Sequence, residues 1–311
     1  MKRKVMQVAQ SSALISLPYK WVKEHNVRKG DELEVTPKGD SLLISTKGTA
    51  LKRQAEVDVT GLDRTTIMYV IRSLYRLGYE TVSLRFPKPL TTYIRKNEEI
   101  SISSVVHTEI NRLVGFEVMQ EKENFCVIKD LQEASYKDFD IVLRRVFLIM
   151  QDAFEEYIDG VKKNNTTALE SIENRHDTVT KFASHCLRLL NKKGEEVEKS
   201  DNYYHIIASL DRITDILKYS ARDAIQHNAR FSKSVVEILV IVKEAFVNFY
   251  KLFYNFDNKL ILKINEQRYT VEKKLKEMKA SNIEVITCTR HLTILEVLLD
   301  LIEARTALEY C

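Results

Sequence analysis

Apolar residues recur at intervals of three and four positions from about residue 134 to the C-terminus, which is the spacing of one face of an α-helix. Residues 195–311 contain neither glycine nor proline, the two residues that most often interrupt a helix. The pattern therefore predicts a long helical region. Six helices with short breaks between them are expected at 137–159, 165–192, 201–229, 232–256, 257–280 and 286–309.

The pattern changes between residues 50 and 131, where strand-like stretches alternate with helical ones. Strands are predicted at AEVDVT and ETVSLRF, and a hairpin at EVMQEKENFCVIKD. One helix is expected from an N-cap at Asp63 to Gly78, and a second one at SVVHTEINRLVGF. This order predicts a small α+β domain over 50–131 with its helices on one face of a sheet, serving as a linker or a dimerisation domain.

The first 49 residues form a third region, a β-rich headpiece with many turn residues. KVMQVA and ALISL are predicted strands, and ELEVTPKGDSLLIS is a predicted hairpin. Pro18 suits the first turn of a short helix at YKWVKEHN, and Gly30 suits the turn that leaves it. The predicted fold class is thus mainly α, with an α+β N-terminal part.

Net positive charge is concentrated in the headpiece. Residues 1–50 contain nine Lys and Arg against five Asp and Glu, whereas the remaining residues hold 39 of each. A basic excess confined to one small domain indicates that this domain meets a polyanion.

Several classes of protein are disfavoured by the composition. No apolar run is long enough to span a membrane, and the first residues lack the apolar core of a secretion signal. The four cysteines are scattered and form no CxxC pair, which argues against a disulfide framework or a zinc–thiolate site. We therefore expect a cytoplasmic protein without a transmembrane segment.

Three pairs of acidic residues lie four positions apart in the predicted helices, beside the apolar stripe. They are Glu173/Asp177, Asp211/Asp215 and Glu296/Asp300. This spacing places both carboxylates of a pair on one helix face, and oxygen clusters of this kind suit Mg²⁺, Mn²⁺ or iron. The alternative interpretation is ordinary solvated charge, which is common in a helical chain with 30% charged residues. The fifth predicted helix has Asn265 and Tyr269 at the positions where an acidic pair would stand. A carboxylate cluster in the last three helices would therefore be incomplete.

No catalytic motif is recognisable. Glu173 and His176 form an ExxH, half of the motif of di-iron bundles, but none of the other six histidines follows a glutamate at that spacing. A glycine-rich phosphate loop, a GxSxG and an HExxH are all missing from the sequence. We therefore expect the protein not to be an enzyme.

The headpiece resembles the AbrB/MazE/SpoVT family of swapped-hairpin DNA-binding domains. The residues that carry the resemblance are Lys2–Val5, Ser11, Ser12, SLPYKWVKEHNV and RKGDELEV. The resemblance implies a homodimer in which two chains interleave their hairpins and bind double-stranded DNA. It also implies DNA contacts from the basic residues of the first strand and the short helix, here Lys2, Arg3, Lys4, Lys20, Lys23 and Arg28.

The region 134–311 resembles PhoU domains, which are two tandem three-helix bundles, here 134–230 and 231–311. The resemblance is carried by ENRHDTVTKFASHCLRLL, by LDRITDILKYSARDA and by the three acidic pairs. It implies that these acids bind a divalent or trivalent metal ion, such as iron, zinc, manganese or magnesium. It further implies a role in regulating phosphate uptake, and the fusion with a swapped-hairpin headpiece is similar to archaeal phosphate uptake regulators.

Three interpretations follow from the sequence. The first is a DNA-binding transcriptional regulator of phosphate uptake, with the bundles as a sensor or partner-docking module. The second is an adaptor that acts on a phosphate transporter ATPase or a signalling protein without binding DNA, so that the headpiece only dimerises the chain. The third is a metalloenzyme or metal store, against which the missing second ExxH counts.

Overall fold

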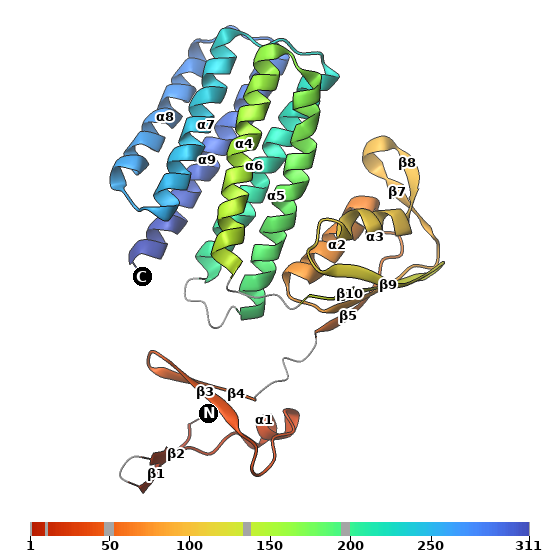
Figure 1. The fold of residues 1–311 in the computed structure, drawn as a ribbon, viewed down its shortest axis with the longest axis vertical. Helices are drawn as coiled ribbons and strands as arrows, with labels where there is room; N and C mark the ends of the chain where they lie inside the picture. The colour runs from red at the N-terminus through yellow and green to blue at the C-terminus, as the bar shows by residue number, and fades with distance from the viewer. Residues whose placement is uncertain (1, 10–11, 47–52, 133–137, 194–199, 311) are drawn as a thin grey trace. The chain divides into compact units, whose positions relative to one another are not determined.

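A computed structural model describes residues 2–9, 12–46, 53–132, 138–193 and 200–310. The chain divides into two compact units, Met1–Lys52 and Arg53–Cys311. It is mainly helical, with a β-rich N-terminal region and helices towards the C-terminus, as the hydrophobic pattern predicted (Figure 1). The finer division into domains at 1–49, 50–131 and 134–311 stays a prediction.

The N-terminal unit consists of two hairpins and a short helix. Its elements are β1 (Met6–Ala9), β2 (Ser12–Leu14), α1 (Tyr19–Glu24), β3 (Leu33–Lys38) and β4 (Ser41–Thr46). Strand β1 pairs with β2 and β3 with β4, both antiparallel, and the two hairpins form separate two-stranded sheets. Asn26 takes the left-handed conformation directly after α1, with a φ of 52°, and Gly30, the residue expected at that turn, lies further along the chain with a φ of 97°. None of the described residues of this unit is buried.

The first part of the second unit, residues 53–132, is here called the α/β subdomain. Its elements are β5 (Gln54–Asp58), α2 (Arg64–Arg76), β6 (Thr81–Arg85), β7 (Leu90–Tyr93), η1 (Ile94–Lys96), β8 (Glu98–Ser101), α3 (Ile102–Ile110), β9 (Phe116–Lys122) and β10 (Phe125–Asp130). A four-stranded sheet has the order β5-β6-β10-β9, in which only the pair β5–β6 is parallel. Helices α2 and α3 bury apolar residues against alternate positions of β6 and β10, including Val82, Leu84, Cys126 and Ile128.

The start and the end of α2 are both set by the residues that the sequence indicated. The Asp63 carboxylate accepts hydrogen bonds from the backbone N–H groups of Thr65 and Thr66, at 3.1 and 3.2 Å. Gly78 follows the helix with a φ of 87°, and a Cβ on it would lie 3.1 Å from Cγ of Lys192. The glycine therefore both ends the helix and lets the chain approach the neighbouring bundle helix closely.

One hairpin of the α/β subdomain was not predicted. Strands β7 and β8 pair antiparallel around η1, and Asn97 takes a left-handed φ of 53° in the connection. The inward positions of β7 are Thr91 and Tyr93, which have no aliphatic side chains, and the connection is rich in charged residues. Alternation of this kind is a weak strand signal, which explains why the sequence did not reveal it.

The described residues of the rest of the second unit form six long helices, as the periodicity predicted, whereas their division into two three-helix bundles stays a prediction. They are α4 (Phe139–Lys163), α5 (Thr166–Lys193), α6 (Ser200–Gln226), α7 (Lys233–Tyr254), α8 (Asn258–Glu277) and α9 (Asn282–Tyr310). Helix α5 packs between α4 and α6, and α7 packs against α8 and α9. Contacts of α4 with α7 and of α6 with α9 join these two groups around one continuous apolar core. In the described residues, no helix has the length and apolarity needed to cross a membrane.

A buried arginine joins the α/β subdomain to the bundle. Arg188 of α5 is 1% exposed and donates to the Asp130 carboxylate and to the backbone carbonyl of Tyr75, both at 2.5 Å. Its guanidinium also lies over the rings of Tyr75 and Phe116, 4.7 and 5.3 Å from their centroids. Helix α5 is accordingly the bundle helix that packs against α2 (Figure 1).

We expect the substitution Arg188→Met to lower the free energy of unfolding by about 3–5 kcal/mol, because it leaves the buried Asp130 carboxylate without its main partner. Urea unfolding followed by circular dichroism measures this change. The double variant Arg188→Met/Asp130→Asn should lose clearly less than the sum of the two single variants, since it removes both charges. A loss below about 1 kcal/mol for Arg188→Met would contradict this account of the junction.

A buried histidine makes the bundle sensitive to acid. His291 of α9 is fully buried, stacks on Tyr157 of α4 with ring centroids 5.3 Å apart, and donates from Nδ1 to the Thr287 carbonyl at 2.8 Å. Burial lowers the pKa of His291 from 6.5 to about 4. The unfolded chain binds the proton more readily than the folded chain does. The stability that the folded chain gains from keeping His291 neutral is therefore complete above pH 6.5 and is lost as the pH falls towards 4.

We expect the unfolding free energy of the wild type to fall between pH 6.5 and 4 by about 3 kcal/mol more than that of His291→Gln. Glutamine keeps a polar side chain in the core but does not titrate, so the difference between the two curves isolates the histidine. Chemical unfolding at a series of pH values provides the comparison. Parallel curves would mean that His291 does not stay neutral in the folded bundle.

Candidate functional site

The acids predicted on the second and third bundle helices lie at the junction with the α/β subdomain. Helix α5 carries Glu173 and Asp177, and α6 carries Asp211 and Asp215. Their neighbours Ile172 and Leu210 are fully buried in the bundle core, which turns the acids to the flank of each helix. The carboxylates of Asp177 and Asp211 are reached by side chains of the α/β subdomain, so this flank is an internal interface.

Two arginines of the α/β subdomain bind these carboxylates. Arg76, at the end of α2, donates to Asp211 at 2.8 Å and to the Ser184 hydroxyl at 3.0 Å. Arg112, which follows α3, donates to Asp177 at 2.8 Å. The Thr180 hydroxyl adds a hydrogen bond to the second oxygen of Asp211, also at 2.8 Å. These two arginine–aspartate pairs are called the arginine seam.

His176 lies between two of the acids. It is 5% exposed, with Nδ1 2.9 Å from Asp177 and Nε2 3.0 Å from Asp215. Burial alone lowers the pKa of His176, but the hydrogen bonds to both aspartates outweigh burial and hold the pKa above its ordinary value. The imidazole therefore carries positive charge more readily than a free histidine and places it between two carboxylates.

The other two acids of this face also have cationic partners. Lys218 Nζ contacts Asp215 and lies 2.9 Å from His176 Nε2, and burial lowers the pKa of this lysine. Arg222 binds both carboxylate oxygens of Glu173, one of them through Nε at 2.8 Å. All four acids of the first two pairs are thus neutralised by Arg, Lys or His side chains of the same chain.

This arrangement does not fit a resident metal ion. Glu173, His176 and Asp177 do present one ligand atom each within 4.8 Å of one another. However, Glu173 is held by Arg222, Asp177 by Arg112, and both nitrogens of His176 lie against carboxylates. A metal would have to displace these partners, and Asp211 is directed to Arg76 and Thr180 instead of joining the three.

The third predicted pair, on α9, lies apart from these four acids. Glu296 accepts from Arg268 of α8 at 2.8 Å, and Asp300 is exposed. At the equivalent places on α8, the Asn265 amide donates to the Ile261 carbonyl and Tyr269 is 63% exposed. Neither side chain adds a carboxylate to Glu296 and Asp300, so the last three helices do not form a second set of four acids.

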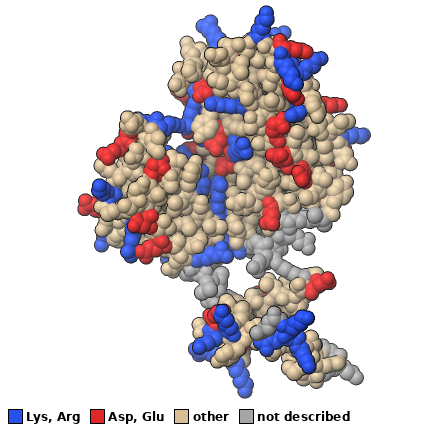
Figure 2. Space-filling view, turned by 180° about the vertical axis from the view of Figure 1, so that it is seen from behind, with Lys and Arg blue, Asp and Glu red and all other residues tan. Residues whose placement is uncertain are grey.

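The six predicted DNA-binding residues all lie on the surface of the N-terminal unit. Among the described residues, only one of them forms an ion pair with an acid: Lys20 lies 3.8 Å from Glu24 in an exposed pair. The backbone N–H of Arg28 also donates to the Asp31 carboxylate at 2.7 Å. Figure 2 shows basic side chains over the visible face of this unit, with few acidic ones between them. The exposed residues are Lys2, Arg3, Lys4, Lys20, Lys23 and Arg28.

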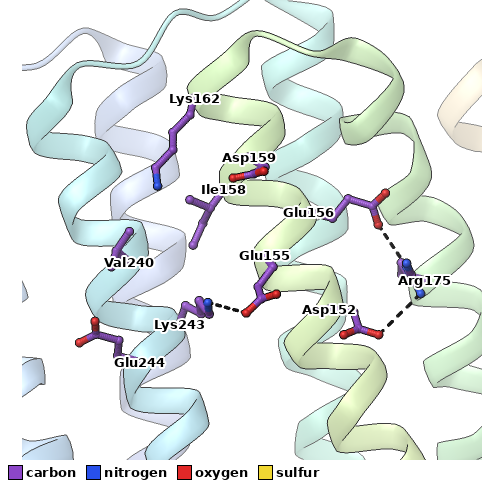
Figure 3. A pocket seen from close by; sticks show the side chains of 10 residues that line it. All are labelled: Asp152, Glu155, Glu156, Ile158, Asp159, Lys162, Arg175, Val240, Lys243 and Glu244. Atoms are coloured by element: carbon purple, nitrogen blue, oxygen red, sulfur yellow. Dashed lines mark hydrogen bonds and ion pairs between the residues drawn. The ribbon is translucent and has the colours of Figure 1, made fainter.

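A groove on the side of α5 that faces away from the α/β subdomain was not predicted. It lies between α4 and α7 with a volume of about 600 Å³, and four acids at helical spacing line it from α4, from Asp152 to Asp159. Figure 3 shows that Arg175 bridges Asp152 and Glu156, and that Lys243 binds Glu155. The spacing of these acids was visible in the sequence, but three of them have partners on other helices, whereas Asp159 pairs with Lys163 of α4 itself. The groove is therefore largely an ion-paired surface.

Sequence reasoning also missed the cations that hold the acidic face. Arg76 and Arg112 lie 135 and 65 residues from the aspartates they bind. Arg188 is likewise 58 residues from Asp130. No local pattern marks an arginine whose partner is this distant, and only the packing of α2 and α3 against α5 and α6 brings the groups together.

The chain was compared with protein-family models, with curated proteins and with solved structures. None of the three comparisons found a match.

Proposed function

We propose that the protein is a DNA-binding transcriptional regulator that acts as a homodimer through its N-terminal unit. The lack of buried residues in the described part of this unit, together with its exposed cations, is the observation that carries the proposal. Two hairpins and six helical residues without a core are not expected to be stable as a single copy in water. A second copy that interleaves its hairpins with the first, as in the swapped-hairpin family, supplies the missing core.

The apolar side chains of the unit support this form of dimer. On the hairpin β3–β4, Val35 and Leu42 are 53 and 63% exposed, and the pairing of the strands puts both on one face together with Ile44. Further apolar residues of the unit are at least half exposed: Val5, Met6, Val8, Leu14 and Ile15. So many exposed apolar side chains in a small unit indicate a surface that is covered in the functional assembly.

The basic residues supply the DNA contacts in this proposal. Cations without acidic partners attract the phosphate backbone at little cost, because no existing ion pair has to be broken. A symmetric dimer presents each cation twice, which suits two half-sites on a duplex. The helical region, which resembles the two three-helix bundles of PhoU domains, is the sensor or partner-docking module, and phosphate uptake is the regulated process.

We expect the full-length protein to bind duplex DNA from upstream of its own gene more tightly than random duplex, with an affinity that falls steeply with salt. Arg3→Ala/Lys4→Ala should weaken binding and reduce the slope of log affinity against log salt by about four, one for each phosphate contact that the two chains of the dimer lose. Fluorescence anisotropy at several salt concentrations measures both quantities.

The matched control is Lys273→Ala/Lys279→Ala, which removes the same charge from two exposed lysines outside the N-terminal unit. It should bind as the wild type does. If both variants lose affinity equally, or if the wild type does not distinguish its own DNA from random duplex, the regulator proposal is wrong. The adaptor that acts on a transporter without binding DNA then becomes the better explanation.

We expect light scattering after size-exclusion chromatography to give twice the mass of one chain. Val35→Glu/Leu42→Glu should shift the protein towards the monomer, because charges on this face cannot enter the shared core. Leu262→Glu is the control, since Leu262 is 61% exposed on α8 and outside the unit. A dimer that survives the double substitution would show that another surface holds the two chains together.

A further inference from the structure

A cavity in the α/β subdomain lies at the carboxyl ends of its two parallel strands. Strands β5 and β6 both end there, and the loop that follows β5 leads directly into α2. The cavity has a volume of about 540 Å³, which is enough for one small molecule. In open α/β sheets, small ligands bind outside the carboxyl ends of the strands. All the lining residues fall within 59–102, so the cavity is separate from the acidic face of the bundle.

One face of the hairpin β7–β8 (Figure 1) forms a wall of this cavity. Leu90, Thr92 and Glu99 lie on the same exposed face of the hairpin, and all three line the cavity. The neighbouring Thr91 points to the other face, where its hydroxyl donates to the Leu62 carbonyl at 2.6 Å. This hydrogen bond ties the hairpin to the loop after β5, and it therefore holds two walls of the cavity together.

Apolar side chains in the lining remain open to water. Leu90 is 50% exposed and Ile94 of η1 is 70% exposed. Phe86 and Ile102, which are buried, line the same cavity and continue the apolar surface into the subdomain. A ligand with an apolar group would remove the side chains of Leu90 and Ile94 from water, which favours binding.

Two charges of opposite sign line the cavity without pairing with each other. Lys88, which follows β6, and Glu99 of β8 are both exposed, and neither forms an ion pair with any described residue. The third charged residue of the lining, Asp63, is already bound as the N-cap of α2 by the N–H groups of Thr65 and Thr66. A free cation and a free anion in one cavity match the two charges of a zwitterion.

We propose that this cavity binds an α-amino acid with an aliphatic side chain, such as leucine. Lys88 binds the carboxylate of the ligand, Glu99 binds its ammonium group, and its side chain covers Leu90 and Ile94. The three contacts come from the end of β6, from the hairpin β7–β8 and from η1. An amine without a carboxylate, or a carboxylate without an amine, makes only two of them.

A phosphorylated ligand fits the same cavity less well. The lining contains one lysine against two carboxylates, Asp63 and Glu99, which repel a dianion. The N–H groups at the start of α2, which could otherwise bind a phosphate, donate to Asp63 instead. The balance of charge therefore favours a ligand that carries one positive and one negative group.

Three probes of matched shape test this binding site on the full-length protein, and the test does not depend on DNA binding by the N-terminal unit. They are L-leucine, 4-methylpentanoate, which lacks the ammonium group, and 3-methylbutylamine, which lacks the carboxylate. We expect L-leucine to bind with a Kd on the order of 0.1 mM, and each of the other two to bind at least about tenfold more weakly. Calorimetry measures the first, and ligand-observed NMR measures the weaker two.

Two single variants assign the charged contacts. Lys88→Ala should weaken L-leucine binding about tenfold but should not weaken 3-methylbutylamine, which has no carboxylate to lose. Glu99→Gln should weaken L-leucine by a similar factor but should not weaken 4-methylpentanoate. If either side chain only shaped the cavity, its removal would weaken all three probes alike. Both residues are exposed, so we expect both variants to fold.

The matched control is Lys129→Ala/Glu117→Gln. These two exposed residues lie opposite each other on β10 and β9, in the same subdomain but outside the cavity. The control should bind L-leucine as the wild type does. The proposal is overturned if leucine, isoleucine, valine and methionine all fail to bind at millimolar concentration, or if L-leucine binds no more tightly than the other two probes. It is also overturned if the control loses as much affinity as the cavity variants, or if those variants lose none.

Discussion

The second unit depends on one buried guanidinium. Burying an arginine is unfavourable unless its charge is paired, and Asp130 supplies this pairing for Arg188. The Tyr75 carbonyl accepts a further hydrogen bond and two aromatic rings lie against the guanidinium, while Nε has no hydrogen-bond partner among the described residues. All of these partners come from the α/β subdomain, although Arg188 itself belongs to the bundle. The contact therefore fixes α2 and α3 against α5, and this placement brings the other arginines to the acidic residues of α5 and α6.

The same helix carries two electrostatic contacts of different character. Removing one partner of a charge pair that is excluded from water leaves a buried charge uncompensated and is costly, whereas each pair of the partly exposed seam contributes about 1 kcal/mol or less. Three to four turns of α5 separate the two kinds of contact. Helix α5 thus carries one contact that is excluded from water and another that water can reach.

Much of the fold was predictable because each element carries its own local signal. All six bundle helices follow from their periodicity, and α2 begins at its Asp63 cap and ends at Gly78 as expected. The hairpin β7–β8 was not predicted, because threonine and tyrosine, and not aliphatic residues, occupy the inward positions of β7. The i,i+4 spacing identified the acidic face, but its partners Arg76 and Arg112 are set by tertiary packing. For that reason the sequence favoured a metal where the structure has guanidinium groups.

The lack of buried residues in the described part of the N-terminal unit makes its folding depend on the concentration of the protein. A segment that completes its core only with a partner has no fixed stability of its own, because its folded fraction follows mass action. When the partner is a second copy, that fraction rises with the total amount of protein, while the second unit, with its own core, stays folded at any dilution. A cell that lowers the amount of this protein severalfold would thus lose folded headpieces faster than it loses chains.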